Sequence, residues 1–581
     1  MTNQVKQAIY RGLRPATAVA LLFVMVIAVT GSAAAKAGNL MGNRGKLAVD
    51  APTPNSNAQV SVIVQFKTMP GSSQYSKFTR QGANVQSKFT GIRAVKMRLP
   101  AALIAKLQQD GNVLYITPDR PVHLTNDNEN YEAAVMADVA SAQYGFDGTG
   151  VGVAVIDSGV SDNVDLHNAS GASRIVYSES FVAGDATTAD GYGHGTHVAG
   201  IIGGNGSAAN GKNYALKMAG MAPGVNIINL RVLDATGAGT DSQVIAAIQR
   251  AVQLKSQYNI RVINLSLGRQ VFESYTLDPL CQAVEQAWQA GIVVVVAAGN
   301  NGRDNSHGTR GYATIGAPGN DPAVVTVGAT RTMDTASRVD DAHASYSSKG
   351  PTLIDHIVKP DLVAPGNRIA SIRVKGSTLD TEYPSLEVGP TTCSTGCTAS
   401  YFRLSGTSMA TPVVSGAVAL MLQEDGTLTP DTVKARMMKT AWKGFGLYSR
   451  AFDIYNNEYD DQYDLFSYGA GYLDVEAALS STDVANAPAL SPTAVRDPAT
   501  GLVRLQNTTS PLFGTSVVWG TSVVWGNTVV WGNTIDASSV VWGASVVWGN
   551  SLDTGYSVVW GTSVVWGNSI EAFSVDQDGE N

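Results

Sequence analysis

Apolar runs rich in valine and isoleucine alternate with helical patterns from residue 148 onward. The runs have the length and composition of strands buried on both faces of a sheet, and they span 151–156, 225–232, 262–267, 292–297 and 323–327. Helical patterns lie between them at 241–254 and at 278–290, where Asp278 is the predicted N-cap and Gly291 the stop. This alternation predicts an α/β fold, a doubly wound and mostly parallel sheet with helices on both faces.

A smaller α+β unit is predicted at residues 58–122, with strand candidates at 60–66, 95–99 and 113–117 and a helix at 100–109. The 581 residues are too many for one ordinary domain. The net charge is +3 for residues 1–35, +9 for residues 36–122 and −19 for the remainder, which gives −7 in total. Opposite charge favours docking of the first unit onto the second, and nothing in this balance indicates nucleic-acid binding.

Residues 1–37 have the composition of a secretory signal. Three basic residues and no acidic ones precede an apolar run at 18–29, and small residues offer cleavage after Ala35 or Ala37. The alternative is an uncleaved membrane anchor, but the run is shorter than the ~20 residues that a span needs. We therefore expect a protein that is secreted or held at the cell surface.

The chain has three cysteines. An exported protein can form disulfides, and Cys393 and Cys397 are close enough in sequence to close a small loop. Bridged and free thiols both remain open for this pair. Cys281 falls inside a helical pattern and is predicted to be a buried apolar residue.

Polar side chains stand where the predicted strands end, which is where sites form in parallel sheets. Asp157 follows the first run, Ser266-Leu267-Gly268 comes after residues 262–265 of the third, and Gly299-Asn300 follows the fourth, while His194 begins a helix of small residues. Ser408 lies among small residues at the start of an apolar helix. An isolated serine there is simply a helix cap, but the dipole of the helix also stabilises an anion beside it.

Amide hydrolysis needs a nucleophile, a base, a group that orients the base and donors for the oxyanion. Ser408, His194, Asp157 and Asn300 supply these types, and the order Asp, His, Ser along the chain is the order found in subtilisin. Three segments resemble the active-site signatures of the subtilisin-like serine peptidases: Val-Ala-Val-Ile-Asp157-Ser-Gly, His194-Gly-Thr-His-Val-Ala-Gly and Gly-Thr-Ser408-Met-Ala-Thr-Pro. Ala-Ala-Gly-Asn300 resembles their oxyanion segment, and the likeness runs over about residues 135–480.

The resemblance implies a serine endopeptidase that acts on polypeptides through an acyl-enzyme. Ser408 would attack the scissile carbonyl, His194 would transfer the proton, and Asp157 would hold the imidazole. Asn300 and the Ser408 backbone N–H would bind the oxyanion. His194 rather than His197 matches the base of the family, and His197 is expected to pack against neighbours of its helix.

Substrate binding in the family is by strand addition. Ser266, Leu267 and Gly268 match one edge of the substrate groove, and Leu233 with residues 237–239 resembles the other. Gly299 is assigned to substrate binding beside Asn300. Ala317-Pro318 resembles a turn next to the primary pocket, where a cis proline is expected.

The chain departs from the family pattern in two places. The resemblance implies no catalytic cofactor and is compatible with a structural calcium ion near Asp165, but residues 205–217 do not reproduce the usual calcium loop, so the metal ligands are unknown. Residues 374–403 form a longer approach to Ser408 than small subtilisins have, and this insertion either borders the cleft or only decorates the surface.

Residues 38–125 resemble the inhibitory propeptides of this family. The resemblance implies a zymogen whose own basic segment covers the substrate face of the catalytic domain, residues 126–485, before self-cleavage between about residues 121 and 136. The sequence does not single out one bond in this range.

The C-terminal part has a different texture. Residues 486–512 have a linker composition, residues 513–570 repeat Val-Val-Trp-Gly and hold seven of the nine tryptophans, and residues 571–581 form an acidic terminus. The repeats suit short stacked strands, and they also match an aggregation-prone composition. Surface attachment, polymer binding, self-association and a removable extension all remain open. A competing hypothesis is therefore a surface or adhesion protein whose protease-like domain mainly matures itself.

Overall fold

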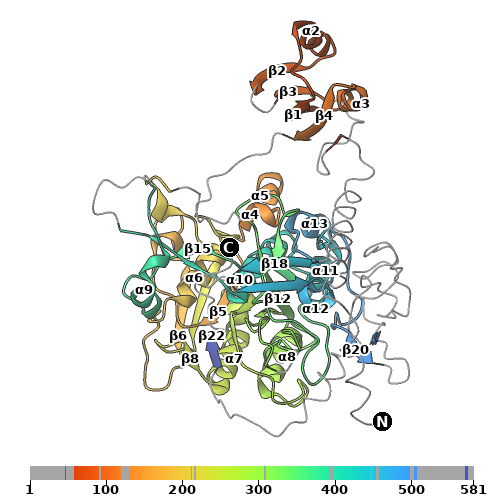
Figure 1. Cartoon of the computed structure of the whole chain (residues 1–581). Helices are drawn as coiled ribbons and strands as arrows, with labels where there is room; N and C mark the ends of the chain where they lie inside the picture. The colour runs from red at the N-terminus through yellow and green to blue at the C-terminus, as the bar shows by residue number, and fades with distance from the viewer. Residues whose placement is uncertain are drawn as a thin grey trace, which may run out of the picture. The chain divides into compact units, whose positions relative to one another are not determined.

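The computed structural model describes most of the chain between residues 58 and 496, with short segments outside that span (Figure 1). The described residues are 46–47, 58–89, 93–118, 131–210, 212–214, 218–306, 309–391, 398–446, 448–452, 457–496, 503–506 and 570–572. The predicted signal, the pair Cys393 and Cys397, and the repeats up to residue 569 lie outside them. The chain forms two compact units, residues 1–124 and 125–581.

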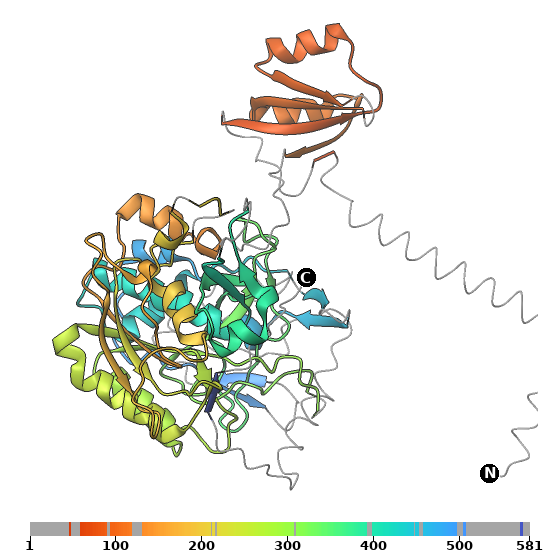
Figure 2. The same cartoon turned by 90° about the vertical axis from the view of Figure 1, so that its left-hand side faces the viewer.

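The first unit is a four-stranded antiparallel sheet in the order β2-β3-β1-β4 with two helices, drawn in orange in Figure 2. Its elements are β1 (Gln59–Phe66), α2 (Ser72–Arg80), β2 (Asn84–Phe89), β3 (Ala94–Pro100), α3 (Ala102–Gln109) and β4 (Val113–Pro118). Val62, Val64 and Phe66 alternate along β1 and share a core with Ile104 of α3, as the period of two along a strand requires. The three strands and the helix predicted from the sequence are confirmed. The sequence analysis missed α2 and β2, which bury few apolar side chains.

The second unit is built on an eight-stranded sheet in the order β13-β12-β11-β9-β5-β7-β6, with β14 beside β12. Neighbouring strands are parallel except β13, which is antiparallel to β12. The strands are β5 (Gly152–Asp157), β6 (Ile175–Ser180), β7 (Asn226–Arg231), β9 (Ile260–Leu265), β11 (Val293–Ala297), β12 (Val325–Arg331), β13 (Ala342–His343) and β14 (Leu362–Pro365). The predicted α/β fold is confirmed, and β6, β13 and β14 extend it beyond the five predicted strands.

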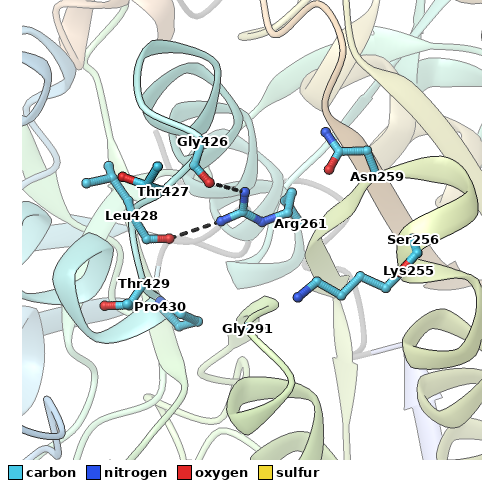
Figure 3. Close-up of a pocket in the computed structure, with 10 residues that line it drawn as sticks. All are labelled: Lys255, Ser256, Asn259, Arg261, Gly291, Gly426, Thr427, Leu428, Thr429 and Pro430. Atoms are coloured by element: carbon cyan, nitrogen blue, oxygen red, sulfur yellow. Dashed lines mark hydrogen bonds between the residues drawn. The ribbon is translucent and has the colours of Figure 1, made fainter.

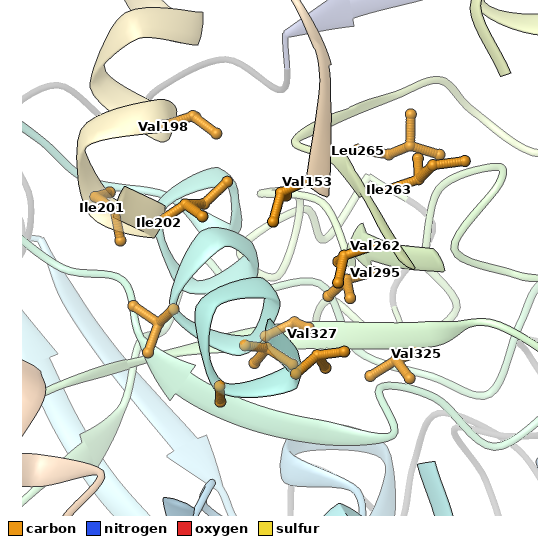
Figure 4. Close-up of a cluster of buried hydrophobic side chains, with 14 of the residues drawn as sticks. Val153, Val198, Ile201, Ile202, Val262, Ile263, Leu265, Val295, Val325 and Val327 are labelled. Atoms are coloured by element: carbon orange, nitrogen blue, oxygen red, sulfur yellow. The ribbon is translucent and has the colours of Figure 1, made fainter. Parts of the chain in front are cut away.

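Helices cover both faces of this sheet. Every residue of β5, β11 and β12 is buried, which requires cover on each side. One pair of helices is α7 (Asp241–Tyr258) and α8 (Pro279–Gln289), which pack against each other, and the other pair is α6 (His194–Gly203) and α10 (Thr407–Glu424). Figure 4 shows α6 and α10 over the valines of the central strands. The predicted cap of α8 is confirmed, because the Asp278 carboxylate accepts from the Leu280 N–H at 2.9 Å.

The carboxyl ends of β5, β9 and β11 share one edge of the sheet because these strands are parallel. Asp157 ends β5, Ser266 follows β9 and Gly299 follows β11. The parallel register therefore gathers the polar residues that the sequence places after each strand.

The segment 486–512, predicted to be a linker, is in part folded onto the second unit. Ala489 and Ser491 are buried, and Ser491 Oγ accepts from Lys434 Nζ at 2.9 Å. β20 (Thr493–Arg496) and β21 (Val503–Gln506) pair as antiparallel strands. The linker prediction is thus corrected over residues 489–496. A Ser/Pro/Ala composition is typical of a linker, but small side chains such as Ala489 and Ser491 also fit buried positions.

Cys281 is buried in α8, as predicted, and its thiol contacts Asn320 Oδ1 at 3.3 Å. Within the described part of the chain, no helix is both long and apolar enough to cross a membrane.

Gly416 sets the approach of α10 to the chain that follows α6. A Cβ atom at this position would lie 2.4 Å from Met221 Cβ and 3.4 Å from Ile202 O. We predict that Gly416→Ala lowers the free energy of unfolding by up to about 2 kcal/mol, because overpacking of about 1–3 kcal/mol outweighs a helix-propensity gain of about 1 kcal/mol. Urea unfolding of the Ser408→Ala protein, which avoids self-digestion, measures the change.

Gly426→Ala is the matched control, since a Cβ atom there meets nothing closer than 3.7 Å. Equal unfolding midpoints for the two variants would contradict the close-packing argument.

Candidate functional site

Asp157 and His194 form a buried hydrogen-bonded pair at the carboxyl end of β5. His194 Nδ1 lies 2.7 Å from Asp157 Oδ1, and both side chains are fully buried. The same carboxylate oxygen accepts from the Ser158 N–H at 2.8 Å. A Cβ atom on residue 195 would lie 2.3 Å from Gly159 O and 3.0 Å from Asp157 Cβ, so glycine at this position permits α6 to begin against β5.

Asp190 anchors the start of α6 and was missed by the sequence analysis. Its carboxylate accepts from the backbone N–H groups of Gly193 at 2.7 Å and Thr196 at 2.8 Å. Ser158 Oγ donates to Asp190 Oδ1 at 2.8 Å and accepts from the Gly195 N–H at 2.9 Å. An acidic residue just before a glycine-rich helix start was the available signal.

The electrostatic environments of the two histidines differ. Burial disfavours the His194 imidazolium, but the charge and hydrogen bond of Asp157 and the charge of Asp190 outweigh it, so the pKa of His194 is raised. Burial and the neighbouring His194 lower the pKa of His197 to about 3. His197 Nε2 lies 3.0 Å from Phe402 O and 3.1 Å from Ile369 O. The prediction that His197 packs against its neighbours is confirmed.

Ser408 lies in the first turn of α10 and is tied to the end of β9. Its hydroxyl donates to Ser266 O at 3.0 Å, and the Ser266 hydroxyl donates to Ser408 O at 2.8 Å. His194 Nε2 is buried and has no hydrogen-bond partner within the described chain. The structure therefore joins Asp157 to His194 and Ser408 to Ser266, and it leaves the outer imidazole nitrogen of His194 available for a proton.

Asn300 is held beside the start of α10 by Thr407. The Thr407 N–H and hydroxyl donate to Asn300 Oδ1 at 2.9 and 3.0 Å, and the Gly299 N–H donates to Thr407 Oγ1 at 3.1 Å. Because the amide oxygen accepts these bonds, the NH₂ end of Asn300 is the donor end. A Cβ atom on Gly406 would lie 3.0 Å from Asn300 Nδ2, so glycine leaves room at this donor.

Two short strands form the edges that the sequence assigned to substrate. They are β8 (Ala238–Gly239) and β10 (Leu267–Gly268), and Leu267 of β10 and the nearby Leu233 are buried. A Cβ atom on Gly239 would lie 2.5 Å from Val232 O and 2.9 Å from Leu233 Cδ2, so Leu233 packs directly behind the β8 edge. The Ala317-Pro318 peptide bond is cis, as predicted.

Comparison with known proteins decides the family, since the model described as "Subtilase family" matches residues 148–471. The chain belongs to the subtilase family. Serine protease AprX of Bacillus subtilis (strain 168) is 36% identical over 358 residues, covering 61% of this chain and 75% of that protein. Subtilisin E of the same organism is 32% identical over 430 residues, covering 73% of this chain and 91% of the relative.

A solved structure titled "Crystal structure of a cold adapted subtilisin-like serine proteinase" is 33% identical, covers 54% of this chain and 83% of its own, and superposes with a TM-score of 0.35. Family and relatives together establish a subtilisin-like serine endopeptidase. Subtilases need no catalytic cofactor.

Residues 378 and 379, in the described part of the insertion at 374–403, contact the loop before His194, which favours the alternative in which the insertion borders the candidate site. The backbone N–H groups of Thr378 and Leu379 donate to Gly191 O and Tyr192 O at 3.1 and 3.0 Å, on the loop that leads into His194. The Thr378 hydroxyl donates to Ala235 O at 2.6 Å, next to the β8 edge. Thr378 and Leu379 of the insertion therefore hold the loop that leads into His194 and the chain next to β8.

The residues around Asp165 do not fit a calcium site. The Asp165 carboxylate accepts from the Tyr401 hydroxyl at 2.8 Å and from the Ala208 N–H, and burial raises its pKa. Arg174 places its guanidinium among the carbonyls of Asp165, Gly203 and Val225. A guanidinium thus already supplies positive charge beside Asp165, and no cluster of three or more histidine, cysteine or acidic side chains suited to a metal occurs among the described residues.

A surface hollow of about 400 Å³ lies away from these residues (Figure 3). Arg261 at its edge donates to Gly426 O at 2.6 Å and Leu428 O at 3.0 Å. These bonds hold the turn between α10 and α11 (Pro430–Thr440), so the arginine has a structural role.

The histidine environments predict distinct titrations. In the Ser408→Ala protein with isotope-labelled histidine, we expect the pKa of His194 to lie above the ordinary histidine value of about 6.5. His197, with a pKa of about 3, should stay neutral as the pH is lowered to about 4. Asp157→Asn removes the charge and should move the His194 titration downward. NMR titration measures each value, and an unchanged His194 titration in Asp157→Asn would contradict the electrostatic account.

Proposed function

We propose that this subtilase is an exported endopeptidase that cleaves polypeptides with the triad Asp157, His194 and Ser408 and is made as a self-processed zymogen. The observation that carries the proposal is the buried 2.7 Å bond between Asp157 and His194 Nδ1, with Nε2 left without a partner among the described residues. Proton transfer to and from a serine requires an imidazole that is oriented by a bond at one nitrogen and has no partner at the other.

In the proposed mechanism, Ser408 Oγ attacks the scissile carbonyl while His194 Nε2 takes its proton. The imidazolium that forms is stabilised by Asp157, and its proton passes to the leaving amine as the C–N bond breaks. Water then attacks the acyl-enzyme carbonyl and gives its proton to His194, and the proton returns to Ser408 Oγ as the ester bond breaks and the acid product leaves. The Ser408 hydroxyl must leave its bond to Ser266 O for this step, a change of one side-chain rotamer.

The oxyanion is proposed to bind between the Asn300 NH₂ group and the Ser408 backbone N–H. Thr407 supports this role because it fixes the amide oxygen of Asn300 and so directs the opposite, donor end. The position of Ser408 in the first turn of α10 adds the helix dipole.

The polypeptide substrate is proposed to add as a strand between β8 and β10. Gly268 and Gly239 belong to these edges, and Leu233 and Leu267 are buried there. Gly299, which precedes Asn300 and donates to Thr407 Oγ1, is proposed to complete the substrate site. Main-chain hydrogen bonds supply affinity that does not depend on sequence.

Export and zymogen formation are proposed from the first 124 residues. The predicted signal accounts for export, and the +9 charge of residues 36–122 complements the −19 of the rest. The repeats at 513–570 are proposed to attach the protease to a surface or to a second copy. Deleting residues 513–566 tests this role, because unchanged surface retention and solubility would remove it.

Loss of the nucleophile is the decisive test. We predict that Ser408→Ala reduces peptide hydrolysis about 10⁶-fold, the loss measured when a subtilisin loses its serine, and that the N-terminal segment is no longer removed. Peptide turnover and N-terminal sequencing of the secreted protein measure both effects. A wild-type protein that matures itself yet cleaves nothing in trans would instead favour the surface or adhesion protein.

Asn300→Ala is predicted to lower kcat by about 10²–10³ with little change in KM, a magnitude taken from a subtilisin, because the amide acts on the transition state. Thr407→Val keeps the backbone donor to Asn300 and removes only the hydroxyl, so the decrease in kcat should be smaller for this variant than for Asn300→Ala. Equal losses would mean that Asn300 acts only through its contact with Thr407.

A further inference from the structure

A short strand near the C-terminus lies between the two substrate edges. β22 (Ile570–Ala572) is the central strand of a three-stranded sheet in the order β10-β22-β8 and is antiparallel to both neighbours. Leu267 faces Ala572 and Gly268 faces Glu571 on one side, while Ala238 faces Glu571 and Gly239 faces Ile570 on the other. Figure 1 shows β22 beside β8.

Both edges are thereby occupied. β8 and β10 have two residues each, and in the described structure neither pairs with a strand other than β22. Successive residues of a strand point their N–H and C=O groups to opposite sides, so a three-residue strand bonds to both edges at once. A substrate that adds between β8 and β10 needs the same backbone groups.

The direction of β22 is the direction of a substrate. The pairing is antiparallel, so β22 advances from Glu571 to Ala572 as β10 is read backward from Gly268 to Leu267, the residue next to Ser266. Ser266 is the residue bonded to Ser408, at 3.0 and 2.8 Å. The segment therefore runs with its carboxyl end toward the nucleophile, as the acyl part of a peptide substrate must.

We propose that residues 570–572 act as a tethered competitor that occupies the peptide groove of the same molecule. This inference rests on the proposed function of β8 and β10 as the substrate edges. A tethered segment competes at an effective concentration that is on the order of 1 mM for short flexible linkers and falls as the linker lengthens, so it raises the KM of a short substrate without changing kcat. The C-terminus would thus restrain the mature enzyme after the N-terminal segment has gone.

Two truncations that keep the whole repeat region test the proposal. A chain that ends at residue 569 lacks β22, and a chain that ends at residue 574 keeps it and loses only the residues beyond. With a short chromogenic peptide, we expect the first truncation to lower KM roughly tenfold with kcat unchanged, and the second to match the full chain. A synthetic peptide of residues 567–574 should inhibit the shorter chain competitively.

Equal KM values for the full chain and the chain ending at residue 569 would overturn the proposal. Equal decreases in both truncations would also overturn it, because the acidic end would then be responsible. Intact mass establishes the C-terminus of each protein assayed.

A second measurement does not depend on activity. Ala238 and Glu571 are opposed across the β8–β22 pair, and opposed antiparallel residues are close enough for a disulfide. In the Ser408→Ala protein, Ala238→Cys with Glu571→Cys should form this bridge on oxidation. Ala238→Cys with Ala572→Cys is the matched control and should not, because the second cysteine is one position out of register.

The two outcomes separate this inference from the proposed function. Absence of the bridge between positions 238 and 571 overturns the occupancy itself. A bridge in a protein whose wild-type form never cleaves peptides means that the proposed endopeptidase function has failed instead.

Discussion

The parallel pairing of β5 with β7 and β9 is the constraint on which the rest of this protein depends. Parallel strands bring their carboxyl ends to one edge, and a sheet buried on both faces needs helices that begin at that edge. Asp157 arrives on a strand, and His194 and Ser408 arrive in the first turns of helices. Residues far apart in the sequence are thus carried by rigid elements at one edge of the sheet, where Asp157 is bonded to His194 and Ser408 is bonded to Ser266.

Close backbone approach makes this arrangement possible. Gly195 lets α6 begin against β5, and Gly416 lets α10 pack closely against Met221 and the carbonyl of Ile202. The buried Asp190 then satisfies the N–H groups at the start of α6 and adds negative charge near His194. The charge that raises the pKa of His194 is therefore also part of what holds the start of α6 in place, so the titration of His194 and the position of the helix depend on the same carboxylate.

Much of the site was predictable because its residue types stand next to strong local patterns. Asp157, Ser266 and Asn300 follow apolar runs that could only be buried strands, and the order of the triad residues matched one protease family. Asp190 was missed although Gly193 and Thr196, two of its partners, are close to it in the chain. The bordering role of residues 377–379 was not predictable, since Gly191 and Tyr192, which accept their hydrogen bonds, lie in another part of the chain. The linker prediction was wrong at Ala489 and Ser491 because composition does not reveal which small residues meet a complementary cavity.

The sequence by itself determined the α/β class and the family, and it singled out the candidates for nucleophile, base and amide, because these predictions depend on periodicity and on residues close together in the chain. The tertiary structure decided which hydrogen bonds those residues make, bonded the Asp165 carboxylate to Tyr401 and Ala208, and placed Ile570–Ala572 between β8 and β10. The strands β8, β10 and β22 are far apart in the sequence and pair through main-chain hydrogen bonds, which any sequence can form. No local pattern near residue 570 could therefore have indicated this pairing.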